Sequence, residues 1–294
     1  MIQKILIVYF SGTGGTERIA NAFETELKYR GCTVTKINLD KSKPKQEDHI
    51  STPSRNKELL ILLYPVYAAD VPPIIYDWIE GIRGDNMKTA VISVSGGGEA
   101  WPNTGCRNKC CRTLEEHGFN VVYEKMMVMP ANCITPTKDQ LAMWLIKAIP
   151  EKVGKILDNL LEGKVRRTKF TFGPVKRYLG YSAKSGYHKF AKNLEITTGC
   201  TGCGICSINC PTGNINMVDN NPAFGNSCIM CLRCIYNCPQ KAIKTELSIV
   251  FKTGFSLARI ENEMDGKELE PVEKLAKGLV WIGLRKYLLD IDGF

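Results

Sequence analysis

The stretch KILIVYFSGTGGTERIANAF, residues 4–23, joins a nearly unbroken run of apolar residues to a loop of glycines and hydroxyl residues. The apolar run, residues 2–10, is typical of a strand that is buried on both faces of a sheet. Beyond the loop, residues 16–30 place Ile19, Ala20 and Phe23 at helical spacing, and Gly31 is a helix stop. The stretch therefore predicts a strand, a tight loop and a helix in direct succession.

The same alternation of strand and helix continues to about residue 161. Apolar or alternating runs predict further strands at residues 33–39, 58–67, 88–95 and 120–129. Helical spacing predicts helices at residues 72–82, 104–117 and 138–161. Because strands that alternate with helices form a parallel sheet, we predict an α/β fold with a doubly wound, five-stranded parallel sheet. Ligands of such sheets bind at the carboxyl ends of the strands.

The loop at residues 11–16, SGTGGT, has the composition of an anion site. A turn there aims backbone N–H groups and the positive end of the next helix at one point. A Walker loop requires lysine after its last glycine, and the dinucleotide fingerprint requires glycine in place of Glu17, so neither motif is present. Hydroxyls and amides can encircle a terminal phosphate monoester, which favours FMN over FAD or NAD. A turn that only connects strand and helix is the alternative.

The loop resembles the phosphate loop of flavodoxins at Ser11, Thr13, Gly14 and Thr16, and the resemblance covers residues 1–161 through the strand order. It implies that FMN is bound by the whole loop: Ser11, Gly12, Thr13, Gly14, Gly15 and Thr16. Further candidates, for the flavin ring, follow the third and fourth strands: Pro65, Val66, Tyr67, Ser95, Gly96, Gly97 and Trp101. Tyr67 and Trp101 can stack on the ring, although aromatic residues can also simply cap a sheet.

Eight of the 13 cysteines form two copies of one pattern, CTGCGICSINCP at residues 200–211 and CIMCLRCIYNCP at residues 228–239. Three thiolates at two-residue gaps can wrap three corners of a cubane, while the fourth cysteine lies beyond a turn fixed by proline and reaches the other cluster. The first [4Fe-4S] cluster would be bound by Cys200, Cys203, Cys206 and Cys238. The second would be bound by Cys228, Cys231, Cys234 and Cys210. Structural zinc is the alternative, but zinc sites usually use two separated pairs with a longer gap.

Residues 195–245 resemble the bacterial two-cluster ferredoxins, including the tails CPTGNI and CPQKAI. Those ferredoxins are often strongly acidic, whereas this segment holds two acidic and three basic residues, which points to different partners. Arg233 stands between two ligands of the second cluster. Since a nearby cation stabilises the more negative reduced state, we expect this cluster to have the higher potential.

The formal net charge of +9 comes from one segment. Residues 163–194 hold nine Lys and Arg and no Asp or Glu, together with several aromatic residues. We expect this segment to pack between the domains, with an acidic redox partner or an anionic membrane as alternative contacts. No nucleic-acid motif is present. No apolar run reaches the roughly 20 residues of a membrane span, and a signal peptide is not recognisable, so we expect a cytoplasmic protein.

We divide the chain into an FMN-binding domain (1–162), the basic segment (163–194), a small α+β 2[4Fe-4S] ferredoxin domain (195–247) and an extension with an amphipathic helix (248–294). The whole resembles the flavodoxin-ferredoxin fusion proteins typical of anaerobic bacteria and archaea. FMN holds one or two electrons and each cluster passes one, so we expect an electron carrier that links a low-potential donor to an acceptor through redox protein partners. The alternatives are an FMN-dependent oxidoreductase, which reduces a quinone, flavin or metabolite with the clusters as electron supply, and a redox sensor.

Overall fold

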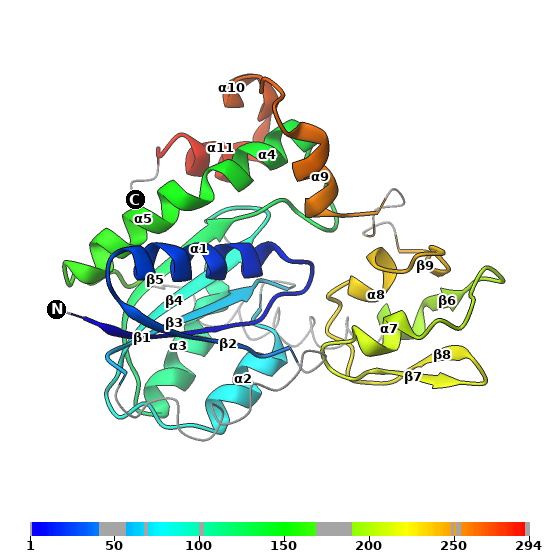
Figure 1. Cartoon of the computed structure of the whole chain (residues 1–294), viewed down its shortest axis with the longest axis horizontal. Coiled ribbons are helices and arrows are strands. Elements are labelled where there is room, and N and C mark those ends of the chain that lie inside the picture. Colours follow the sequence, from blue (N-terminus) through cyan, green and yellow to red (C-terminus); the bar gives the residue numbers. More distant parts are fainter. Residues whose placement is uncertain are drawn as a thin grey trace.

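A five-stranded parallel sheet forms the centre of the molecule, whose computed structural model describes residues 2–40, 57–67, 70–99, 103–168, 190–247, 250 and 254–291 (Figure 1). Its strands are β1 (Lys4–Tyr9), β2 (Thr33–Asn38), β3 (Leu59–Pro65), β4 (Lys88–Ser95) and β5 (Asn120–Val128). They lie in the order β2-β1-β3-β4-β5, with every neighbouring pair parallel. This is the flavodoxin-like order, which confirms the predicted fold class, and it opens a crevice beyond the carboxyl ends of β1 and β3.

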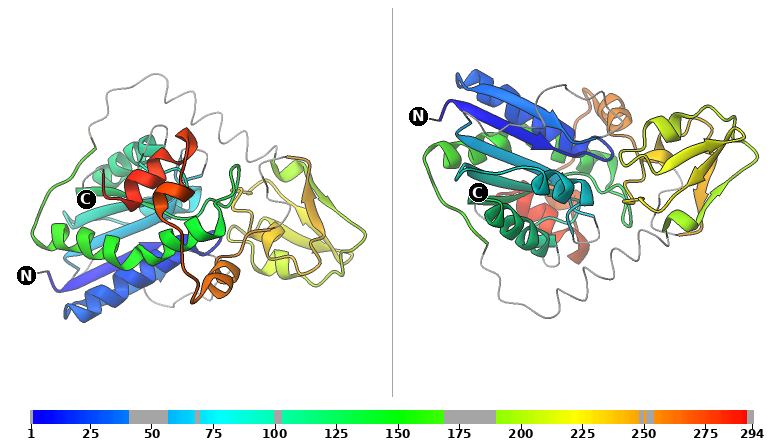
Figure 2. Two further views of the ribbon diagram at one scale, coloured as in Figure 1. Left: turned by 90° about the horizontal axis from the view of Figure 1, so that it is seen from above. Right: turned by 90° about the horizontal axis from the view of Figure 1, so that it is seen from below.

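Two layers of helices cover the sheet (Figures 1 and 2). The helices α1 (Gly15–Tyr29), α4 (Asp139–Lys147) and α5 (Ile149–Leu161) share a core with one face, and α2 (Pro73–Glu80) and α3 (Arg107–Glu116) share a core with the other. Successive residues of β1 alternate between them, since Ile5 and Ile7 belong to the first core and Leu6 and Val8 to the second. Burial of both faces explains why the strands read as continuous apolar runs.

The single helix predicted at residues 138–161 is wrong. The structure has α4 up to Lys147 and a separate α5 from Ile149, with Pro150 in the first turn of α5. Proline has no N–H for the bond to the carbonyl four residues earlier and clashes with that carbonyl, so the helix restarts. Proline is tolerated in the first turn, where N–H groups have no helical partner.

A smaller part, rich in cysteine, lies beyond the carboxyl ends of the sheet strands (Figures 1 and 2). It contains two antiparallel pairs, β6 (Leu194–Ile196) with β9 (Ile243–Thr245) and β7 (Ile215–Val218) with β8 (Asn221–Phe224). Two short helices, α7 (Ile205–Ile208) and α8 (Arg233–Tyr236), follow equivalent positions of the two cysteine repeats, 28 residues apart. This part has the small α+β composition that the sequence predicts.

The C-terminal residues fold back onto the sheet domain near α4 (Figure 1). They form α9 (Leu257–Met264), α10 (Val272–Leu275), a 3₁₀ turn at Leu279–Trp281 and α11 (Ile282–Leu288). The sequence PVEKLAKGLVWIGLRKYLL, residues 271–289, predicts the amphipathic helix of the extension as one continuous helix, and this prediction is wrong. Ala276 leaves helical geometry, and Gly278 takes φ 90°, a conformation that suits glycine and ends the helix.

The basic segment is described only at its two ends. Arg166 bridges to Tyr123 of β5, with hydrogen bonds Glu124 N to Arg166 O (2.8 Å) and Arg166 N to Val122 O (3.0 Å). Residues 169–189, which hold most of its charge, lie outside the described residues, and so does the predicted packing between domains. Among the helices that the structure describes, none has the length and apolarity needed to cross a membrane.

Candidate functional site

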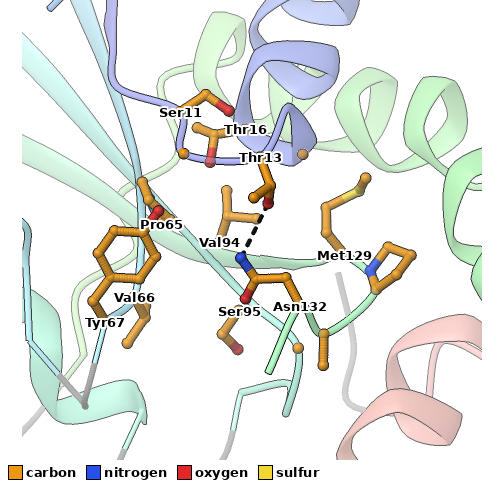
Figure 3. Close-up of a pocket in the computed structure, with 15 residues that line it drawn as sticks. Ser11, Thr13, Thr16, Pro65, Val66, Tyr67, Val94, Ser95, Met129 and Asn132 are labelled. Atoms are coloured by element: carbon orange, nitrogen blue, oxygen red, sulfur yellow. Dashed lines mark hydrogen bonds between the residues drawn. The ribbon is translucent and has the colours of Figure 1, made fainter. Parts of the chain in front are cut away.

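A pocket of about 430 Å³, partly open to solvent, lies at the carboxyl edge of the sheet (Figure 3). The loops after β1, β3, β4 and β5 form its walls, as the position of the crevice predicts. The residues around it are Ser11, Gly12, Thr13, Gly15, Thr16, Pro65, Val66, Tyr67, Val94, Ser95, Gly96, Met129, Pro130, Ala131 and Asn132. Most of the predicted flavin-site residues are thus brought together at one place.

The loop from Ser11 to Thr16 has the features of a phosphate site. The first helical bond of α1 is Arg18 N to Gly14 O (3.2 Å), so the N–H groups of the preceding turn have no partner within the helix. Gly14 has φ 91°, which turns the chain into the helix at little steric cost. Ser11 is only 5% exposed, and its Oγ has no hydrogen-bond partner among the described residues. A buried hydroxyl without a partner beside free amides fits a bound phosphate.

The aromatic wall of the pocket is formed by Tyr67, which stands opposite Met129 (Figure 3). A Cβ atom on Gly12 would lie 2.0 Å from the Tyr67 hydroxyl, so only glycine lets this ring stand over the loop. Trp101, the second ring candidate, lies outside the described residues. Gly97 is not among the lining residues and instead approaches the Asn103 side chain, since a Cβ there would lie 2.9 Å from Asn103 Nδ2.

One wall of the pocket was missed by the sequence analysis. Residues 129–132 follow β5 and close the side facing the phosphate loop, where Asn132 Nδ2 donates to Thr13 Oγ1 at 3.1 Å (Figure 3). The carboxyl end of the fifth strand meets the same edge as those of the others, which is the signal that would have found it. Arg18 does not line the pocket: it pairs with Glu261 of α9 at 2.5 Å and donates to Gly14 O at 3.3 Å.

The cysteine-rich part holds a second cavity, of about 370 Å³ and partly open to solvent, beside four of the predicted ligands. These are Cys210, Cys228, Cys231 and Cys234, the set predicted for the second cluster. Burial raises the pKa of the Cys231 thiol to about 12, and its neighbours Cys228 and Cys210 add to the rise. Burial likewise raises the pKa of Cys234, with contributions from the same neighbours. Cys210 of the first repeat therefore lies among the thiols of the second.

The complementary set gathers Cys203, Cys206 and Cys238. Burial raises the pKa of the Cys206 thiol, and both Cys203 and Cys238 raise it further. Cys200 lies in the turn just before them, where its N–H bonds Thr197 O at 3.1 Å. Within the described parts of the chain, no three His, Cys, Asp or Glu side chains are placed to hold a single metal ion. A four-iron cluster is larger than one ion, so its ligands stand farther apart.

The backbone of the two repeats has the same local geometry. Positive φ occurs at three equivalent pairs, which are Gly202 and Met230 (67° and 57°), Gly204 and Leu232 (73° and 64°), and Gly213 and Lys241 (64° and 49°). Equivalent amides also bond the fourth cysteine of each repeat, Asn214 N to Cys210 Sγ at 3.2 Å and Ala242 N to Cys238 Sγ at 3.3 Å. Amide bonds to sulfur are among the features that tune iron-sulfur clusters.

The second repeat, not the first, contacts the pocket. A Cβ on Gly12 would lie 3.2 Å from Cβ of Cys231, so a predicted cluster ligand touches the phosphate loop. Arg233 binds the carbonyls of Ser11 and Gly12, and Tyr236 donates from its hydroxyl to Asn132 O at 2.6 Å. Of the equivalent residues in the first repeat, Cys203 is exposed, Ile208 is 70% exposed and Ile205 is half-buried.

Comparison with known proteins finds no matching family model and no matching curated protein. Solved structures with similar folds include oxidised flavodoxin 2 from Bacillus cereus, 17% identical, covering 53% of this chain and 99% of that one with a TM-score of 0.37. Two-electron reduced flavodoxin from Megasphaera elsdenii is 22% identical and covers 51% and 98%, with a TM-score of 0.33. General stress protein 14 from Treponema denticola, in complex with FMN, is 11% identical and covers 53% and 99%, with a TM-score of 0.40. Each likeness extends over about half of this chain.

Proposed function

We propose that this chain is an electron-transfer protein that relays electrons between FMN, bound by a domain at residues 1–162, and two [4Fe-4S] clusters, bound at residues 195–247. The basic segment, residues 163–194, and the C-terminal extension, residues 248–294, complete the division of the chain. The observation that carries the proposal is the contact between Gly12 of the phosphate loop and Cys231 of the second repeat. It supports the proposal because Cys231 is a predicted cluster ligand and Gly12 belongs to the predicted phosphate loop, so the two proposed sites would be neighbours.

The pocket residues fit FMN. Ser11 Oγ, the hydroxyls of Thr13 and Thr16 and the amides before Arg18 would hold the phosphate, and Tyr67 would stand beside the ring. Among the residues that the structure describes, no lysine or arginine lines the pocket, so the phosphate charge would be balanced by amides and the α1 dipole. FMN, when bound, exchanges one or two electrons, whereas each cluster exchanges one.

The cysteine residues fit two clusters with exchanged fourth ligands. Cys210 lines one cavity with Cys228, Cys231 and Cys234, and the thiols of Cys203 and Cys238 both raise the pKa of Cys206. A single zinc ion per repeat would instead need each repeat's own cysteines around one point. We assign the first cluster to Cys200, Cys203, Cys206 and Cys238, and the second to Cys228, Cys231, Cys234 and Cys210.

The test is anaerobic reconstitution of the full chain with iron, sulfide and FMN. We expect about eight iron atoms and one FMN per chain, and a roughly halved iron content in Cys206→Ser and in Cys234→Ser. Cys106→Ser is the control, because Cys106 is buried against α2 and α3 and belongs to neither cluster set. A wild-type chain that binds no FMN, or one that takes up zinc in place of iron, would refute the proposal.

The reconstituted protein also separates a carrier from an enzyme. We expect the reduced protein to pass electrons to an oxidised one-electron protein carrier faster than to a quinone or free flavin, measured by stopped-flow absorbance at equal acceptor concentration. Faster saturable reduction of a small molecule would favour the oxidoreductase alternative instead.

A further inference from the structure

Arg233 joins the second cysteine repeat to the phosphate loop through two hydrogen bonds and makes further bonds to Asp40 and Asn209. Its Nη2 donates to Ser11 O at 2.6 Å and its Nε to Gly12 O at 2.8 Å. Its Nη1 donates to Asp40 Oδ2 at 2.5 Å and to Asn209 O at 3.0 Å. The residue is 8% exposed, so its charged group is largely removed from water and has these acceptors instead.

The two carbonyls that Arg233 binds belong to successive peptide groups of the phosphate loop. A trans peptide is planar, with its carbonyl and its N–H on opposite sides. Fixing Ser11 O toward Arg233 therefore turns the Gly12 N–H away from it, and fixing Gly12 O turns the Thr13 N–H away likewise. The pocket is lined by Gly12 and Thr13 and not by Arg233, so the guanidinium lies behind the loop.

Arg233 has no counterpart in the first repeat. The equivalent position, 28 residues earlier, is Ile205, which follows the same turn and begins the same short helix. The backbone of the two repeats nevertheless has the same local geometry, with positive φ at Gly204 and Leu232, the residues just before Ile205 and Arg233. A guanidinium at this position is thus not needed to form the cysteine loop, and in the second repeat it bonds Asp40, the phosphate loop and Asn209.

We infer that Arg233 is a positioning residue for flavin binding: it orients the Gly12 and Thr13 amides toward the phosphate of FMN, a role that rests on the proposed FMN and cluster sites. Asp40, at the end of β2 and 4% exposed, fixes the guanidinium from the other side. The loop of the second cluster and the phosphate loop then form one binding unit. Occupancy of either site favours the binding-competent form of the other.

The test compares FMN with riboflavin, which lacks the phosphate. The full chain with reconstituted clusters is titrated anaerobically with each flavin, and the quenching of flavin fluorescence gives both Kd values. The ratio of the riboflavin Kd to the FMN Kd measures the phosphate contribution. In Arg233→Met we expect this ratio to fall about tenfold, because hydrogen bonds to a charged group are lost, while the riboflavin Kd changes little.

Two further variants keep the test decisive if Arg233→Met loses its clusters. Arg233→Lys keeps the charge but cannot bind both carbonyls with one planar group, and Asp40→Asn leaves the cysteine repeat unchanged. Each should lower the ratio by about threefold. Arg30→Met is the matched control, because Arg30 pairs with Glu26 and Asp158 at the other end of α1, and should change neither Kd.

An unchanged ratio in these variants, or an equal weakening of both flavins, would overturn the positioning role. Equal weakening would mean that Arg233 only holds the two parts of the chain together. Failure of the proposed function is distinct from both results, since the wild-type chain would then bind neither flavin or would carry no iron.

Discussion

At the residue scale, the two repeats have different side chains at positions that share the same backbone conformation. Gly213 and Lys241 are equivalent residues with φ 64° and 49°, and each amide bonds the carbonyl of the repeat's fourth cysteine. Glycine adopts this conformation freely, whereas a residue with a Cβ is strained by roughly 1 kcal/mol. The strain persists in the second repeat because the surrounding cysteine loop dictates the turn.

Lys241→Gly should therefore stabilise the cysteine-rich part by about 0.5–1 kcal/mol, because relief of strain exceeds the added entropy of the unfolded chain. The measurement is the midpoint of thermal cluster loss, followed by absorbance under anaerobic conditions. Lys244→Gly is the control, since Lys244 is also exposed but lies in β9, where glycine weakens the strand. A lower midpoint for Lys241→Gly would contradict the argument.

A second residue-scale prediction concerns Asp290, which pairs with Lys152 and Lys155 of α5. Lys152 is 1% exposed, so loss of its partner leaves a buried charge poorly compensated, and we expect Asp290→Asn to cost about 1–2 kcal/mol near pH 7. Asn tolerates φ 55° as well as Asp does, so the variant changes the charge and not the backbone.

The difference in the free energy of unfolding between wild type and Asp290→Asn should depend on pH through the pKa of Asp290. Despite some burial, hydrogen bonds from Lys152 and Lys155 lower this pKa below 3.8. A lowered folded-state pKa gives stability that is present above the unfolded-state value and lost as the pH falls through the folded value. Urea unfolding should show wild type and Asp290→Asn converging below about pH 4. A difference in the free energy of unfolding that stayed constant with pH would mean that the ion pair contributes nothing to stability.

At the scale of elements, the strands could be predicted because each carries its own signal. Strands β1 and β3 are apolar runs buried on both faces, whereas the edge strand β2 is marked by alternation of apolar and polar residues. Helix ends were less predictable. Whether Pro150 ends one helix or starts another depends on α4 and α5 both packing on the sheet, which periodicity does not encode.

The candidate site also has parts that the sequence could predict and parts that it could not. Repeated spacing predicts the cysteines as ligands, and glycines with hydroxyls predict the phosphate loop, because both signals are local; both assignments stay predictions. Tyr236 and Asn132, which link the two parts, are 104 residues apart and carry no motif. Arg233 was noted as a cation near the second cluster, but Asp40 was not foreseen as its partner. The Asp40 carboxylate offsets the charge of Arg233 and so reduces its electrostatic effect on the second cluster. The higher reduction potential expected for this cluster stays a prediction, with a smaller expected difference.

The C-terminal helices supply an element-scale prediction. Gly283, in α11, packs directly on the loop after β4, and a Cβ there would lie 2.4 Å from Gly97 O. Gly283→Ala should push this loop from its position beside the pocket and cost about 1–3 kcal/mol in stability. Since that loop adjoins the side of the pocket proposed for the flavin ring, we expect the binding of riboflavin and of FMN to be weakened equally.

That result would separate Gly283 from Arg233, whose replacement should affect only the phosphate contribution. Thermal unfolding and the two flavin titrations provide the measurements. Gly154→Ala is the control, because a Cβ on that α5 residue meets nothing nearer than 4.0 Å and alanine favours the helix. If Gly283→Ala behaved like Gly154→Ala, α11 would not support the ring loop.

At the scale of the whole molecule, two similar repeats occupy different environments. The second repeat contacts the flavin pocket through Cys231 and Arg233, while the first turns Cys203 and Ile208 to solvent. The two repeats, although similar in sequence, thus differ in their surroundings because the second one packs on the sheet domain. If the proposed groups are bound there, the exposed first cluster lies at one end of the chain of cofactors and FMN at the other.

This asymmetry leads to a prediction about the intact protein. Cys234 and Cys206 are equivalent, so Cys234→Ser and Cys206→Ser remove a ligand from the second and the first cluster by the same chemical change. Loss of the second cluster should loosen the loop that carries Arg233, and binding sites that share one structural unit are coupled by about 1–3 kcal/mol. The FMN Kd should therefore rise about tenfold in Cys234→Ser and stay near the wild-type value in Cys206→Ser.

Anaerobic FMN titration with iron analysis of the same samples provides the measurement. An equal rise in both variants would show that cluster loss disturbs the cysteine-rich part as a whole, and no rise in either would show that the phosphate loop holds its shape without the second cluster.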